Sequence, residues 1–150
     1  MAEDRDTLLE YYRESRAVLV AATDGLDRAR MTERTLDGWS VKEHLAHVVL
    51  WDELRSSEVE RISAGHESAW RMTEAHVDAY NEIGHELRKG LSLAQVMWEL
   101  EHSRARLLRA IGEASARGLD GSLYGEAGLK SDHEMEHAGW IRAWRKRMGY

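Results

Sequence analysis

Two short segments carry histidines at spacings that can place imidazole rings side by side on a helix. His133 and His137 are four residues apart, so in a helix both rings project from one face and can bind one metal ion. A third ligand must come from another segment, and the sequence His44-Leu-Ala-His47 offers two candidates. Chance is the alternative, because the chain has eight histidines and spacing does not show that the segments meet. The remaining histidines have no such arrangement and are expected at the surface or its boundary: His66, His76, His85 and His102.

A metal ion held by three neutral imidazoles keeps one coordination position open, which is the pattern of catalytic rather than structural sites. Such an ion can lower the pKa of a bound water or polarise a substrate. Hydrolysis would also need a general base, and Glu43, Asp52 and Glu136 are candidates by their spacing from the histidines. Each could equally be a carboxylate on a solvated helix face, so the sequence assigns no catalytic residue.

Two long helices are expected in the first part of the chain. Apolar residues near helical spacing predict a helix over about 5–23, and a polar segment over 24–38 follows it. Ser40-Val-Lys-Glu43 has the pattern of a capping box. A second helix with a broad apolar stripe should therefore run from this box to about residue 64.

The later elements are expected to be a linker, a short helix and two further long helices. The linker covers 65–72 and the short helix about 73–89. Ser92-Leu-Ala-Gln95 and Ser131-Asp-His-Glu134 look like capping boxes. They would open one helix that ends near Arg117 and, after a glycine-rich loop over 118–130, a last helix with a basic final turn. The fold class is thus all-α, and the long crossover before the third main helix argues against a simple up-down-up-down bundle.

Composition excludes several classes of function. The 150 residues fit one domain, expected to span 1–150. Without cysteine, disulfides, thiolate metal sites and a cysteine nucleophile are excluded. A net charge of −6 with no basic stripe argues against nucleic acid as a partner. No apolar run could span a membrane and the acidic start does not resemble a secretory signal, so a cytoplasmic location is expected.

The chain has six tryptophans and no phenylalanine. A tryptophan buries a large apolar area, but its ring N–H needs a hydrogen-bond partner. Some of these rings could therefore line a cavity for a small molecule instead of filling the core. Four lie nearest the histidine motifs and are candidates for binding a substrate: Trp39, Trp51, Trp140 and Trp144. The competing interpretation places them in the core, and we favour it for at least two of the four.

Two motifs resemble signature sequences of the DinB-like superfamily. Gly38-Trp-Ser-Val-Lys-Glu-His-Leu-Ala-His47, followed by Trp51, is similar to the motif on the second helix of that family. His133-Glu-Met-Glu-His137, with Trp140-Ile141 and Trp144, is similar to the motif on its fourth helix. The resemblance covers nearly the whole chain, and Tyr80-Asn81-Glu82 with the late loop is most similar to the ClbS/DfsB branch.

The resemblance implies a four-helix bundle, often dimeric, that binds a divalent ion such as zinc or nickel. Carried over by position, the metal ligands would be His47, His133 and His137. His44 lies one turn before the usual ligand position, so it would either support a ligand or lie at the surface. Asp37 stands where the family usually has a proline, a departure that concerns the loop conformation and not the ligands.

Together, the motifs and the resemblance predict a metal-dependent enzyme for a small molecule. The resemblance implies a hydrolase or a thiol transferase, with a ClbS-like resistance role included. Two alternatives stay open: a protein that sequesters a small molecule without turnover, and a structural bundle whose histidines are fortuitous. The expected partners are a small-molecule ligand and a second copy of the chain, with no nucleic acid and no membrane.

Overall fold

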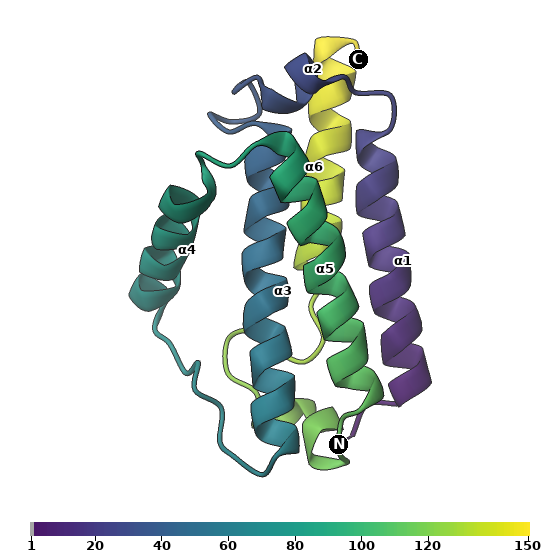
Figure 1. Ribbon diagram of the computed structural model, residues 1–150, viewed down its shortest axis with the longest axis vertical. Helices are drawn as coiled ribbons and strands as arrows, with labels where there is room; N and C mark the ends of the chain where they lie inside the picture. The colour runs from purple at the N-terminus through teal and green to yellow at the C-terminus, as the bar shows by residue number, and fades with distance from the viewer. Residues whose placement is uncertain (1) are drawn as a thin grey trace.

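Four long helices form a bundle, and a shorter helix stands beside it (Figure 1). The structure is a computed structural model and describes residues 2–150. The bundle consists of α1 (Arg5–Thr23), α3 (Val41–Ser63), α5 (Leu93–Gly112) and α6 (His133–Met148), while α4 (Glu74–Arg88) packs mainly against α3. The predicted all-α class, with a short helix in the crossover between α3 and α5, is confirmed. Across the described residues, no helix has the length and apolar character needed to cross a membrane.

Side-chain caps begin most helices where the sequence indicates. The Ser40 hydroxyl accepts from the Glu43 N–H at 3.2 Å and the Glu43 carboxylate accepts from the Ser40 N–H at 3.2 Å, so the predicted capping box of α3 is present. Thr73 caps α4, and Ser92 caps α5 by accepting from the Gln95 N–H at 3.1 Å. Gln95 does not return this bond but donates to a glutamate on the next turn, so the box predicted at α5 is only half formed.

A short helix in the segment 24–38 was not indicated by the sequence. α2 (Arg28–Thr32) begins at Asp27, whose carboxylate accepts from the Arg30 N–H at 2.9 Å, and it buries Met31. A five-residue helix contains too little apolar periodicity to be recognised in a polar segment. Its contribution is to close the end of the bundle where the C-terminus also lies (Figure 1).

α5 ends earlier than predicted, at Gly112 instead of about Arg117. Two short 3₁₀ turns, Arg117–Leu119 and Gly121–Leu123, follow it. They bring Gly118 so close to α3 that an added Cβ would lie 1.9 Å from the Ser63 hydroxyl oxygen. The segment after Gly112 is therefore not α-helical, and its packing against α3 outweighs the helical pattern of its sequence.

A layer of buried charges separates two apolar parts of the core. Arg104 donates to Asp52 at 2.9 Å and to Glu134 at 2.7 Å, and Arg16 donates to Asp52 at 2.7 Å and also pairs with Glu134. Leu19 and Leu100 belong to the apolar cluster on one side of this layer, and Leu8 and Leu107 to the cluster on the other. Because Glu134 turns into this layer, the capping box predicted at Ser131-Asp-His-Glu134 does not form.

Candidate metal centre

The bundle brings the three predicted metal ligands together. His47 extends from α3, and His133 and His137 extend from the first two turns of α6. One ligand nitrogen of each ring lies within 4.8 Å of those of the other two. Nitrogens bound to one tetrahedral zinc ion at about 2.0–2.1 Å would be roughly 3.3 Å apart. Small movements of the rings would therefore allow this group to hold a metal ion.

His137 is held from two sides. Its Nε2 lies 3.0 Å from Nε2 of His133, and its Nδ1 lies 2.8 Å from Nδ1 of His44. If Nε2 of His137 binds a metal, Nδ1 keeps its proton and donates a hydrogen bond to Nδ1 of His44. His44 would then orient the His137 ring, a role that a carboxylate, a backbone carbonyl or a water fills at most metal-binding histidines. His44 is buried, so of its two expected places the geometry favours the supporting one.

The environment keeps these imidazoles neutral. Burial, followed by the neighbouring histidines, lowers the pKa of His137 to about 2 and that of His47 to about 3. Burial also lowers the pKa of His133 and of His44. Metal binding requires the neutral imidazole, so this group need not release protons at pH 7 to bind a cation.

Trp39 and Trp140 flank the histidine cluster. The Trp140 ring centroid lies 4.8 Å from that of His137, and the side chain is 48% exposed. The Trp39 ring centroid lies 5.3 Å from that of His44 and 5.7 Å from that of His47. Both rings therefore lie against the histidine cluster, and about half of the Trp140 side chain is exposed there.

Trp51 and Trp144 are buried, and only Trp51 is near the cluster. The Trp51 ring centroid lies 6.3 Å from that of His133, and its Nε1–H donates to Oδ1 of Asn81 at 2.8 Å, which ties α4 to α3. Trp144 is 1% exposed and belongs to the core, where its Nε1–H donates to the hydroxyl of Thr35. Trp144 therefore lies in the core and not beside the histidine cluster, because its helical position turns it between helices.

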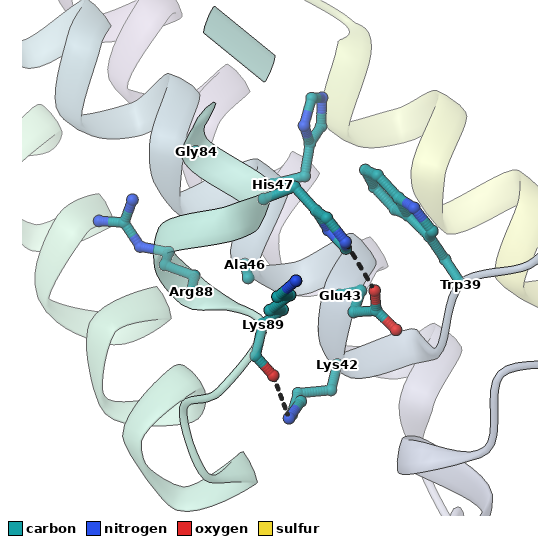
Figure 2. Close-up of a pocket in the computed structure, with 9 residues that line it drawn as sticks. Trp39, Lys42, Glu43, Ala46, His47, Gly84, Arg88 and Lys89 are labelled. Atoms are coloured by element: carbon teal, nitrogen blue, oxygen red, sulfur yellow. Dashed lines mark hydrogen bonds and ion pairs between the residues drawn. The ribbon is translucent and has the colours of Figure 1, made fainter. Parts of the chain in front are cut away.

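His85 has contacts that the sequence did not indicate. It lies at the surface boundary as expected, with 17% of its side chain exposed, and its ring stacks on Trp39 with centroids 4.9 Å apart and planes 5° apart. Its Nε2 lies 3.3 Å from Oε2 of Glu43. These side chains and His47 line a small pocket between α3 and α4 (Figure 2). No local pattern could have revealed this, because Trp39 and His85 meet only after α4 docks on α3.

The three carboxylates considered as general bases have different surroundings. Burial alone would raise the pKa of Asp52, but the guanidinium groups of Arg104 and Arg16 outweigh burial and lower it. Asp52 is thereby held as a charge partner inside the bundle. Glu43 caps α3 and faces His85, and Glu136 is exposed on α6.

Comparisons with known proteins agree with this fold. The profile of the DinB superfamily matches residues 11–141. An uncharacterised protein from Escherichia coli UTI89 superposes with a TM-score of 0.77 at 12% identity, covering 97% of this chain and 94% of the other. A mycothiol-dependent maleylpyruvate isomerase superposes with a TM-score of 0.65 at 17% identity, covering 93% of this chain and 58% of that enzyme. At such identities the likeness shows the fold alone. No curated protein matches the chain.

Proposed function

The chain belongs to the DinB superfamily, and we propose that it is a divalent-metal-dependent enzyme that acts on a small molecule. The observation that carries this proposal is the convergence of three histidine nitrogens within 4.8 Å. His47, His133 and His137 would hold the ion, and imidazole ligands suit zinc or nickel. When bound, the ion would polarise a substrate or lower the pKa of a coordinated water or thiol.

The surroundings of the cluster support a catalytic rather than a structural ion. Three protein ligands leave one position for water or substrate, whereas structural sites usually have four. Trp140 is half exposed beside His137, and Trp39 lies on the side of His47. We propose that these two rings form the apolar walls against which a small molecule binds.

The proposed reaction is hydrolysis or thiol transfer. The thiol candidate draws support from the similar fold of the mycothiol-dependent isomerase, although this chain spans only 58% of that enzyme. The hydrolytic candidate includes a ClbS-like resistance role, which Tyr80-Asn81-Glu82 favours. In the structure, Tyr80 and Asn81 contact Trp51 and attach α4 to α3. A homodimer is part of the same proposal.

Metal analysis of purified protein tests the proposal. After loading with Zn²⁺ or Ni²⁺ and desalting, mass spectrometry should find one ion per chain in the wild type. His137→Ala should lose it, and His66→Ala should keep it because His66 is exposed outside the cluster. A folded wild type that retains neither ion would refute the proposal.

The reaction class needs a second measurement. A loaded protein that consumes a model ester with water alone indicates a hydrolase, and one that consumes an electrophile only when a low-molecular-weight thiol is added indicates a thiol transferase. Saturable binding of a ligand with no turnover by the loaded protein would favour sequestration instead.

A further inference from the structure

The side of α4 that turns away from α3 carries two rows of exposed residues. α4 packs mainly against α3, and its far side points away from the bundle (Figure 1). Residues four apart share a face of a helix. One such row is apolar, with Ile83 60% and Leu87 72% exposed, and the row beside it is acidic. The apolar row consists of Ala75, Ala79, Ile83 and Leu87, and the acidic row consists of Glu74, Asp78, Glu82 and Glu86.

Most of the acidic row has no counter-ion within the protein. The carboxylates of Glu74, Asp78 and Glu82 form no ion pair within residues 2–150, and Glu86 pairs with the exposed Lys89 at 2.7 Å. Like charges at this spacing destabilise a helix. Large apolar side chains that stay exposed beside one another are typical of interaction sites. A partner that covers this side of α4 should therefore offer apolar surface together with positive charge.

The second half of α6 offers that combination. Trp140 is 48% exposed, and Ala143, three residues further on, is exposed as well. Arg142 and Lys146 form a basic row beside them and are spaced four residues apart, like the members of the acidic row. Both cations are exposed, and neither forms an ion pair in the part of the chain that the structure describes. The apolar and basic rows of α6 thus complement the apolar and acidic rows of α4.

α4 and α6 border the same side of the bundle. The Trp39 ring stacks on His85 of α4 with centroids 4.9 Å apart, and its centroid lies 5.3 Å from that of His44. The centroid of the Trp140 ring on α6 lies 6.3 Å from that of the same His44. A two-fold axis on this side would place α4 of each copy against α6 of the other, so that the same contact forms twice.

We propose that the chain forms a two-fold homodimer in which α4 of each copy docks on α6 of the other, with the acidic row facing Arg142 and Lys146. Two copies with a net charge of −6 repel each other, so association needs an arrangement that brings opposite charges together. The proposal rests on the proposed function, which includes a homodimer, and it assigns the surfaces. α4 of the partner would also cover Trp140 and close that side of the ligand site.

Two charge-reversed variants test this interface. Asp78→Lys/Glu82→Lys changes α4, and Arg142→Glu/Lys146→Glu changes α6. Because the two-fold axis repeats the contact, either variant alone would place like charges together at both contacts. Like charges across an interface cost several kcal/mol, so the dimer dissociation constant in sedimentation equilibrium should rise by roughly 100-fold for each variant.

Mixing the two variants gives the sharpest result. In a mixed dimer, the new lysines on α4 of one copy meet the new glutamates on α6 of the other, and the second contact keeps its original charges. An equimolar mixture should therefore regain a dissociation constant close to that of the wild type, which would also show that both variants are folded. The matched control is Glu101→Lys/Arg109→Glu, which reverses two exposed charges on α5 and should dimerise like the wild type.

Several outcomes would overturn the interface. They are reversed variants that dimerise as tightly as the wild type, a mixture that stays monomeric, and a control that dissociates as much as the reversed variants. A monomeric wild type would overturn it as well, even if a synthetic basic amphipathic peptide binds to α4, because the occupant would then be a different protein.

Metal content separates the interface from the proposed function. The reversed residues lie outside the histidine cluster, so both variants should retain as much Zn²⁺ as the wild type after loading and desalting. A wild type that dimerises through these surfaces but retains no metal would support the interface and refute the proposed function.

Discussion

Replacing Asp52 by asparagine is expected to destabilise the protein strongly. Asp52 is 1% exposed and accepts from Arg104 at 2.9 and 3.2 Å, from Arg16 at 2.7 Å and from the Ser103 hydroxyl at 3.3 Å. With Glu134, the buried layer contains two cations and two anions. The substitution would leave two guanidinium groups with one carboxylate and would direct an amide N–H₂ toward one of them.

The magnitude follows from this uncompensated charge. Removing one partner of a buried pair typically costs about 3–5 kcal/mol, because the remaining charge stays buried without its counter-ion. In a domain of this size about 1 kcal/mol shifts Tm by roughly 2–4 °C, so Asp52→Asn should lower Tm by on the order of 10 °C. This loss is a large fraction of a typical unfolding free energy of about 5–15 kcal/mol.

Urea unfolding followed by circular dichroism would measure the change. Glu60→Gln is the matched control, since it removes a carboxylate paired with Arg106 at 3.1 Å where both side chains are more than a third exposed, and such pairs contribute roughly 0–1 kcal/mol. The double variant Arg16→Met/Asp52→Asn removes one charge of each sign and should be less destabilised than the sum of the single variants. An Asp52→Asn protein within about 1 kcal/mol of the wild type, as expected only for a surface pair, would refute the reasoning.

The same variant should show a defined pH dependence. The folded-state pKa of Asp52 is below its unfolded value of about 3.9. Its contribution is therefore fully present above about pH 4 and is lost as the pH falls through the folded-state pKa. The difference in stability between the wild type and Asp52→Asn should stay constant from about pH 7 to pH 5 and shrink at lower pH.

Three further predictions concern other parts of the chain. Without metal, the free energy of unfolding should fall as the pH drops below about 6.5, because the unfolded chain binds protons that the imidazoles of His47 and His137 do not bind in the folded state. In thermal melts over a pH series, the slope of this free energy against pH should approach about 2.7 kcal/mol per pH unit for these two groups. A free energy of unfolding that does not change with pH would contradict the prediction. Gly125→Ala should lower the free energy of unfolding by about 1–3 kcal/mol, because the added Cβ would lie 2.0 Å from a backbone carbonyl oxygen. Gly139→Ala should instead raise it by up to about 1 kcal/mol, because the added Cβ would have no atom within 4 Å and alanine favours the helix. Urea titrations of both variants would measure these changes. Trp51→Phe removes the donor to α4 and should cost about 1 kcal/mol, with faster amide hydrogen exchange in α4 as the specific sign.

Local signals predicted most of the helices. Ser40 and Thr73 are followed by long periodic segments, and the helices begin where these caps indicate. The misses occur where a distant contact decides the local conformation. Glu134 has the spacing of a capping residue but forms ion pairs with Arg16 and Arg104 on other helices. A short stretch of sequence around Glu134 shows the possible cap but not these distant arginines.

The candidate site was predictable to a similar extent. The spacing of His133 and His137 indicates a shared helical face, and the resemblance singled out His47 over His44 as the third member. The arrangement of His85 against Trp39 could not be predicted, because it depends on how α4 lies against α3. The burial of Trp144 likewise depends on the rotation of α6 in the bundle, which apolar periodicity near a histidine motif does not fix.

The buried charge layer also limits how far α6 can slide along its neighbours. A shift by one helical turn, about 5.4 Å, would carry the Glu134 carboxylate out of reach of both guanidinium groups, whereas a purely apolar contact tolerates several registers. Glu134 directly precedes the turn that bears His137 and directly follows His133. The ion pairs of the buried layer therefore determine the position of α6 along the bundle axis, and with it the position of its two imidazoles opposite α3.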